Sequence, residues 1–162
     1  MPFIVSWPGV TKPGSRDHHL IQNIDYAETF LDIAGAKIPS DMQGRSLVPL
    51  LKGQSPKNWR TSIYYHYYEY PSFHMVPRHY GIRTERYKLM HFYRFGNEWE
   101  MYDLQKDPDE LTNLYGQPGQ AKLTADLKKQ LYALQKHYGD ESDLSEMPKE
   151  WKDKVRPGTA QK

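Results

Sequence analysis

Apolar side chains recur at helical spacing in the first part of the chain. Tyr26, Phe30 and Ile33 follow one another at intervals of four and three residues, which predicts a short helix. Asp25 and Glu28 stand three residues apart at its beginning, so we expect Asp25 to cap the helix and Glu28 to complete a capping box. Because the helix carries apolar side chains on more than one side, we expect it to pack against a sheet.

Two further elements are predicted in the same part of the chain. The run at residues 2–5 is almost wholly apolar, as in a strand that is buried on both faces, so we predict a strand over residues 1–7. Such a strand needs a neighbour on each side, and we therefore expect it to belong to a larger sheet. Residues 46–51 predict a second short helix, and the polar stretch at 54–60 predicts a linker.

The second part of the chain has a different pattern. Short segments with strand-like composition occur at residues 62–69, 80–85, 88–94 and 98–104, and they predict an antiparallel meander. Leucines then recur every three or four residues within 119–138, which predicts one amphipathic helix. The simplest packing places this helix across one face of the sheet.

The composition limits the classes of function that remain. The 162 residues carry a net charge of +2, which favours neither nucleic acid nor a membrane surface as a partner. No apolar stretch is long enough to cross a membrane, and residues 1–7 lack the basic start and the cleavage site of a signal peptide. The absence of cysteine excludes a disulfide framework, a thiolate metal site and a cysteine nucleophile.

The residues present do not form a known catalytic or metal-binding pattern. There is no glycine-rich nucleotide loop and no serine in a Gly-x-Ser-x-Gly elbow. His18 and His19 are adjacent, so their side chains point in different directions. The acidic residues at 107–110 lack the spacing of a calcium-binding EF-hand. We therefore expect no catalytic residue and no metal ligand within this chain.

Histidine and arginine are concentrated between the first two predicted strands. His74, Arg78, His79 and Arg83 lie within ten residues, beside tyrosine and phenylalanine. An arginine fork suits sulfate, phosphate or carboxylate oxygens, and a histidine can donate or accept near neutral pH. We expect these residues to contact a ligand, with His74 and Arg78 foremost. The alternative is that His79 and Arg83 simply alternate outward from a strand.

The chain resembles the closing section of a type I sulfatase in four ordered segments, at residues 2–9, 23–35, 43–51 and 101–114. The last of them contains Tyr-Asp-Leu-x-x-Asp-Pro-x-Glu-x-x-Asn-Leu, which is similar to a signature of that family. The tyrosine-rich run and residues 78–84 resemble most the bacterial sulfatases that act on glycosaminoglycan sugars, in particular the N-acetylglucosamine-6-sulfatases.

The resemblance implies a fold of class α/β, here as an α+β fragment. Residues 1–55 would form the end of the alkaline-phosphatase-like α/β catalytic domain. Residues 56–139 would form the C-terminal subdomain, a four-stranded antiparallel sheet packed with a C-terminal helix, and residues 140–162 a tail.

The family also implies two cofactors, a calcium ion and a formylglycine made from Cys or Ser, which attacks the sulfur. This sequence has no Ser-x-Pro-x-Arg or Cys-x-Pro-x-Arg motif and no positions that match the calcium ligands. The resemblance therefore implies that this chain holds neither cofactor.

We therefore expect a C-terminal part of a sulfatase that is inactive alone. It would supply His74, Arg78, His79 and Arg83 to the pocket for a sulfated carbohydrate, such as the 6-sulfated N-acetylglucosamine of glycosaminoglycans. Its expected partner is the upstream catalytic domain, and the resemblance implies that the parent enzyme is exported to the periplasm or out of the cell. Two alternatives remain: a stand-alone carbohydrate-binding or interaction domain without catalysis, and a part of a related phosphodiesterase or phosphonate hydrolase.

Overall fold

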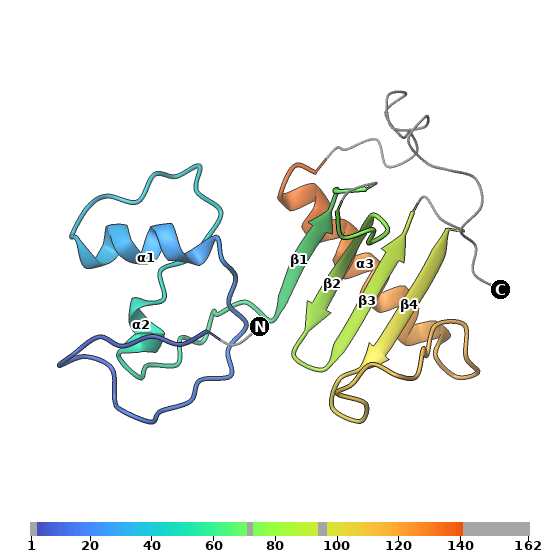
Figure 1. Cartoon of the computed structure of the whole chain (residues 1–162), viewed down its shortest axis with the longest axis horizontal. Helices are drawn as coiled ribbons and strands as arrows, with labels where there is room; N and C mark the ends of the chain where they lie inside the picture. Colours follow the sequence, from blue (N-terminus) through green and yellow to red (C-terminus); the bar gives the residue numbers. More distant parts are fainter. Residues whose placement is uncertain (1–2, 71–72, 94–96, 141–162) are drawn as a thin grey trace. The chain divides into compact units, whose positions relative to one another are not determined.

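The computed structural model describes residues 3–70, 73–93 and 97–140. The chain divides into two compact units, Met1–Ile63 and Tyr64–Lys162, which we call the first and the second unit (Figure 1). Within the described ranges, no helix is both long enough and apolar enough to span a membrane.

The first unit contains two helices. Helix α1 spans Asp25–Ile33 and helix α2 spans Val48–Leu51, so both predicted helices are confirmed. The buried apolar side chains include those of Leu47 and Leu50, at α2. The sulfatase domain boundary predicted at residues 55–56 falls within this unit and stays a prediction.

The strand predicted over residues 1–7 is wrong for the part that the structure describes. Residues 3–7 form no strand, and Ile4 is 90% exposed. Phe3 and Val5 are exposed as well. A strand must exchange hydrogen bonds with a neighbour, and no described strand pairs with these residues.

The predicted capping box is also absent. Helix α1 begins at Asp25 itself, its N-cap is Ile24, and no side chain among the described residues caps it. Asp25 and Glu28 are buried and accept hydrogen bonds from a later loop instead. The N–H of Arg45 donates to Asp25 Oδ1 at 2.9 Å, and that of Gly44 donates to Glu28 Oε1 at 2.5 Å. A cap stands outside the first helical turn, so a residue that is already helical cannot serve as one.

The second unit is built on a four-stranded sheet in the order β1-β2-β3-β4. The strands are β1 Ser62–Tyr67, β2 His79–Thr84, β3 Tyr87–Phe92 and β4 Glu98–Asp103, with β1 beginning at the end of the first unit. Strand β3 is antiparallel to both of its neighbours. The predicted meander is therefore confirmed, with small differences at the strand ends.

The predicted C-terminal helix is confirmed as α3, Ala121–His137, which crosses one face of the sheet (Figure 1). The core of the unit forms where the two meet. Its buried residues come from three strands and the helix: Tyr80, Ile82, Leu89, Met101, Leu127 and Leu131. Burying a side chain of this size contributes about 1.5–3 kcal/mol. This apolar contact therefore holds α3 on the sheet.

Candidate functional site

The residues predicted to bind a ligand fall on β2 and on the linker before it. Side chains alternate along a strand, and Tyr80 and Ile82 of β2 pack into the core with α3. His79 and Arg83 therefore point to the opposite side of the sheet, which we call the second face. This placement agrees with a ligand role, and it equally satisfies the alternative that the two residues simply alternate outward.

His74, Arg78 and Arg83 differ in their surroundings. His74 is exposed, and its ring stands edge-on to that of Phe73, with the centroids 5.5 Å apart. Arg83 is also exposed. Arg78 is buried, with only 8% of its surface accessible. The structure therefore leaves the side chains of His74 and Arg83 open to a ligand, whereas Arg78 exposes only a small part of its surface.

The ring of His79 has a fixed orientation. Its Nδ1 lies 2.8 Å from the carbonyl oxygen of Pro77. A carbonyl oxygen only accepts, so Nδ1 carries the proton and donates it. The ring of Tyr67 stacks on His79 at 5.5 Å, and that of Phe92 lies at 5.1 Å. When the imidazole is neutral, Nε2 is left as an acceptor for a hydroxyl or an N–H group.

Two tyrosines of β1 belong to the same face, and sequence reasoning did not single them out. The ring of Tyr65 lies across Gly81, where a Cβ atom would come within 2.6 Å of the phenol oxygen. The hydroxyls of Tyr65 and Tyr67 are buried, and neither has a hydrogen-bond partner in the described part of the chain. Burial raises the pKa of Tyr65, so its hydroxyl stays protonated and can donate. Side chains alternate along β1, and Tyr64 packs against the core. This alternation could have predicted that Tyr65 and Tyr67 point to the second face.

A second polar group surrounds His66, on the face that α3 covers. The Nδ1 of His66 lies 2.7 Å from Asp140 Oδ2, and its Nε2 lies 2.9 Å from the hydroxyl of Tyr93. The hydroxyl of Tyr64 donates to Asp140 at 2.5 Å. Burial lowers the pKa of His66, although the hydrogen bond to Asp140 acts in the opposite direction. These bonds connect β1 to Asp140, which lies three residues after the end of α3.

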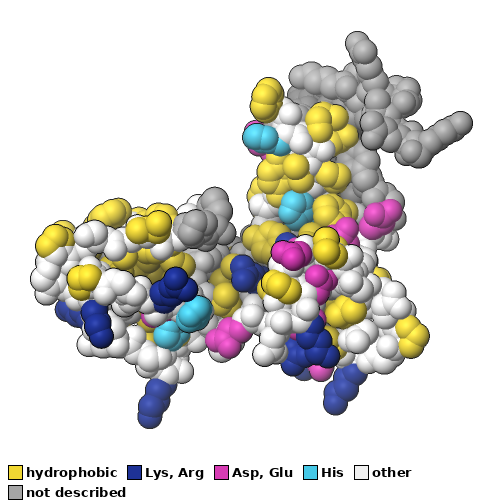
Figure 2. All heavy atoms as spheres, turned by 60° about the horizontal axis from the view of Figure 1, so that its bottom comes forward, with side chains coloured by type: hydrophobic (Ala, Val, Ile, Leu, Met, Phe, Trp, Pro, Cys, Tyr) yellow, Lys and Arg dark blue, Asp and Glu magenta, His cyan; other side chains and the backbone are white. Residues whose placement is uncertain are grey.

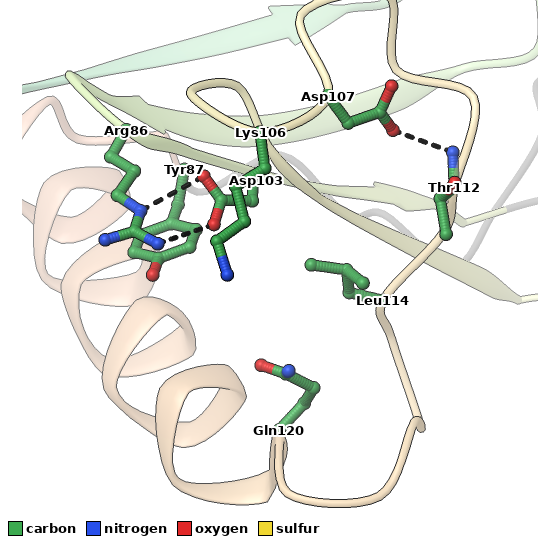
Figure 3. Close-up of a pocket in the computed structure, with 8 residues that line it drawn as sticks. All are labelled: Arg86, Tyr87, Asp103, Lys106, Asp107, Thr112, Leu114 and Gln120. Atoms are coloured by element: carbon green, nitrogen blue, oxygen red, sulfur yellow. Dashed lines mark hydrogen bonds and ion pairs between the residues drawn. The ribbon is translucent and has the colours of Figure 1, made fainter.

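A cavity of about 370 Å³ lies at the turn after β4 (Figure 3). Its lining residues are Arg86, Tyr87, Asp103, Lys106, Asp107, Thr112, Leu114 and Gln120. Arg86 donates to both oxygens of Asp103, at 3.0 and 2.7 Å, and the N–H of Thr112 donates to Asp107 at 2.8 Å. Both carboxylates are therefore engaged by donors of the protein, and they stabilise the turn.

The first unit brings Ser55 to His19, from 36 positions away in the sequence, and Asp17 lies next to the same histidine. His19 Nδ1 lies 2.8 Å from Asp17 Oδ1, and His19 Nε2 lies 3.1 Å from Ser55 Oγ. This is the order of acid, base and hydroxyl found in serine hydrolases, which sequence spacing did not predict. The Asp17 side chain is 44% exposed, however, and Ser55 is exposed too. Water competes for such bonds, so we assign them to linking the two segments.

The described residues offer no ligand set for a metal ion. Across the described ranges, no three His, Asp or Glu side chains are grouped closely enough to hold one. The full sequence also contains no Cys-x-Pro-x-Arg or Ser-x-Pro-x-Arg motif from which a formylglycine could be made. The calcium ion of the type I sulfatases therefore has no fitting site among the residues that the structure describes.

Comparison with known proteins points to one family. The family described as N-sulphoglucosamine sulphohydrolase, C-terminal, matches residues 1–137. An N-acetylglucosamine-6-O-sulfatase of Bacteroides thetaiotaomicron is 49% identical over 142 residues, which cover 86% of this chain and 25% of that protein. An ulvan-active sulfatase of Formosa agariphila is 31% identical over 170 residues, which cover 86% of this chain and 34% of that protein.

A solved structure has the same fold. The structure of BT4656 in complex with its substrate, D-glucosamine-2-N,6-O-disulfate, matches with a TM-score of 0.81 and 46% identity. The match covers 87% of this chain and 29% of that one. The chain thus spans about a quarter to a third of the length of these relatives. The expected α/β fragment, with its four-stranded antiparallel sheet and C-terminal helix, is confirmed.

Proposed function

This chain belongs to the sulfatase family, in the part that corresponds to the C-terminal domain of N-sulphoglucosamine sulphohydrolase, and we propose that it forms one wall of a sulfatase substrate pocket. The complete enzyme hydrolyses the sulfate ester of an amino sugar, with 6-sulfated N-acetylglucosamine as its substrate. The upstream catalytic domain supplies the nucleophile and the calcium ion. On this proposal, the chain has no turnover alone.

One observation carries the choice of substrate. The chain is 49% identical to an N-acetylglucosamine-6-O-sulfatase and 31% identical to an ulvan-active sulfatase, over matches that each cover 86% of this chain. The larger identity favours an amino sugar with a 6-sulfate group. The contacts of this chain agree with such a ligand, because the second face presents the Nε2 edge of the His79 ring and an exposed cation at Arg83.

We assign contact with the sugar or its sulfate to His74, Arg78, His79 and Arg83. An arginine fork can place two parallel N–H groups on sulfate oxygens. His74 and Arg83 are exposed and could meet the ligand directly. Arg78 is buried, where a charge-assisted hydrogen bond is stronger than in water.

The proposal also assigns domains. Residues 1–55 complete the α/β catalytic domain, and residues 56–139 form the C-terminal subdomain. The second unit supports this division because it has an apolar core of its own, built from a sheet and a helix. The first unit exposes many of its apolar side chains instead.

The test uses a fusion protein. The upstream part of the Bacteroides N-acetylglucosamine-6-O-sulfatase is joined to this chain where the two sequences begin to match. Turnover of 6-sulfated N-acetylglucosamine is then measured for the fusion protein and for the chain alone. We expect turnover by the fusion protein only. Turnover by the chain alone would overturn the proposal.

The residues are tested in the same fusion protein. We expect His74→Ala and Arg83→Ala to lower kcat/KM by about tenfold or more, as lost contacts to a charged group do. The matched control is His137→Ala, an exposed histidine on α3. An unchanged kcat/KM in both site variants would refute the assignment of these residues.

A further inference from the structure

Helix α1 is oriented opposite to an ordinary surface helix. Its polar side chains Asp25, Glu28 and Thr29 are buried, with exposed fractions of 0%, 2% and 6%. Its apolar side chains Phe30 and Ile33 are 71% and 44% exposed. A helix normally buries its apolar stripe, because removing that surface from water is the main favourable contribution to packing.

Hydrogen bonds of the buried side hold α1 in this orientation. The backbone N–H of Leu47 donates to Thr29 Oγ1 at 2.8 Å, and that of Arg45 donates to Asp25 at 2.9 Å. Turning the helix to bury its apolar side would leave these groups without partners. The apolar side is therefore exposed because the rest of the unit holds it there.

The segment at the start of the chain extends the same apolar surface. The ring of Phe3 stacks on that of Tyr26, with the centroids 5.0 Å apart and the planes inclined by 16°. Figure 2, in which the first unit lies on the left, shows hydrophobic side chains gathered along an edge of that unit. We define the docking face as Phe3, Ile4, Val5, Ile24, Tyr26, Phe30 and Ile33, all of which are exposed.

We propose that the docking face packs against an apolar surface of the upstream part of the sulfatase, an inference that rests on the proposed function. Two observations indicate that the upstream part of the sulfatase is the partner of the docking face. The relatives are three to four times as long as the matched region, so most of their chain lies outside this structure. Residues 3–5 also form no strand, so their backbone N–H and C=O groups can pair with a strand of the partner.

The two parts of the docking face, on α1 and at residues 3–5, contribute to this packing in different ways. The exposed stripe of α1 excludes water from the partner surface, and the segment at residues 3–5 fixes the direction of approach through its backbone. The seven side chains that define the docking face are all uncharged. The partner surface must therefore be apolar too, since a charge buried there would have no counter-ion.

The experiment exploits the absence of cysteine in this sequence. Phe30→Cys places a single thiol on the docking face, and Leu111→Cys places one on an exposed apolar position of the second unit, which is 83% exposed. Reaction with a maleimide is followed by mass spectrometry of the peptide that carries the thiol. Each variant is made in the chain alone and in the fusion protein with the upstream part of the relative. Ile33→Cys is a second probe of the docking face.

We expect the thiols at positions 30 and 33 to react about tenfold more slowly in the fusion protein than in the chain alone, because thiol reactivity follows exposure. The thiol at position 111 should react equally in both. Equal reaction at all three positions would overturn the proposal. If the thiol at position 30 becomes protected in the chain alone as its concentration rises, a second copy is the occupant and the proposal is wrong.

The failure of this inference can be told apart from the failure of the proposed function. Sulfatase turnover is measured on the fusion protein without introduced cysteines. Protection at position 30 without turnover supports the docking face and contradicts the proposed substrate. Turnover with a fully reactive thiol at position 30 contradicts the docking face alone.

Discussion

The guanidinium group of Arg60 contacts both oxygens of the Asp25 carboxylate. Nη1 lies 2.5 Å from Oδ2, and Nη2 lies 2.6 Å from Oδ1. The Asp25 side chain is 0% exposed and that of Arg60 is 7% exposed. A bidentate pair of this kind fixes the start of α1 to a residue that is 35 positions away in the sequence.

Replacing Arg60 by Ala should destabilise the first unit by about 3–5 kcal/mol, because it leaves a buried carboxylate without its cation. Among the described residues, Asp25 would keep the backbone donors of Gln22 and Arg45. Chemical denaturation followed by circular dichroism measures the change. The control Arg16→Ala removes an exposed arginine and should have little effect. Equal stability of the two variants would show that the pair does not anchor α1.

Asp103 should make the stability of the second unit depend on pH in acid. Its hydrogen bonds to Arg86 hold the pKa of the carboxyl below its ordinary value of 3.8. The ionised carboxylate of Asp103 therefore stabilises the folded second unit above pH 3.8. This stabilisation is lost as the pH falls through the lower, folded-state pKa. Unfolding by denaturant at several pH values between 2 and 6 measures this. We expect Asp103→Asn to flatten that part of the profile, and an unchanged slope would contradict the assignment.

Gly81→Ala should destabilise the sheet by about 1–3 kcal/mol, as overpacking of a filled interior does. The added Cβ would lie 2.6 Å from the carbonyl oxygen of Leu89 and 2.6 Å from the hydroxyl oxygen of Tyr65. The tyrosine ring could move, but the backbone oxygen belongs to the neighbouring strand. Thermal unfolding of the variant, compared with Arg83→Ala on the same face of β2, measures the cost. A melting temperature equal to that of the control would show that the close approach is absent.

His66 should titrate below its ordinary value of 6.5, because burial disfavours its charged form. The neutral ring of His66 therefore contributes to the stability of the second unit above pH 6.5. This contribution is lost as the pH falls through the lower, folded-state pKa. The hydrogen bond to Asp140 opposes the shift, so Asp140→Asn should lower the pKa of His66 further. Nuclear magnetic resonance of the imidazole protons follows both titrations. Asp17→Asn, which removes a partner of His19, should leave the titration of His66 unchanged.

The sequence predicted the second unit well because its signals are local. Alternating strand residues and leucines at helical spacing follow from the geometry of the backbone, which is the same in every protein. All four strands and α3 were found in this way. The group from His74 to Arg83 was also visible, because its members are close together in the chain. Whether these residues bind a sugar stays a prediction.

The sequence could not show which residues of distant segments meet. Tyr65 joins His79 on the second face through the pairing of β1 with β2, and its ring covers Gly81 of the neighbouring strand. Asp17, His19 and Ser55 meet across a loop. Such contacts depend on strand register and on loop closure, and neither leaves a periodic signal.

Helix α1 separates the two kinds of information most clearly. The sequence by itself determined that a helix forms there, and the spacing of Tyr26, Phe30 and Ile33 marked its apolar side. The tertiary structure alone decided which side is buried. Gln22 is a local donor to Asp25, but Gly44, Arg45 and Arg60 donate to Asp25 and Glu28 from 16 to 35 residues further along the chain. No local pattern could therefore predict that the polar side is buried. Buried carboxylates need such donors within the same unit, whereas apolar side chains need no hydrogen-bond partner and can stay exposed until another surface covers them.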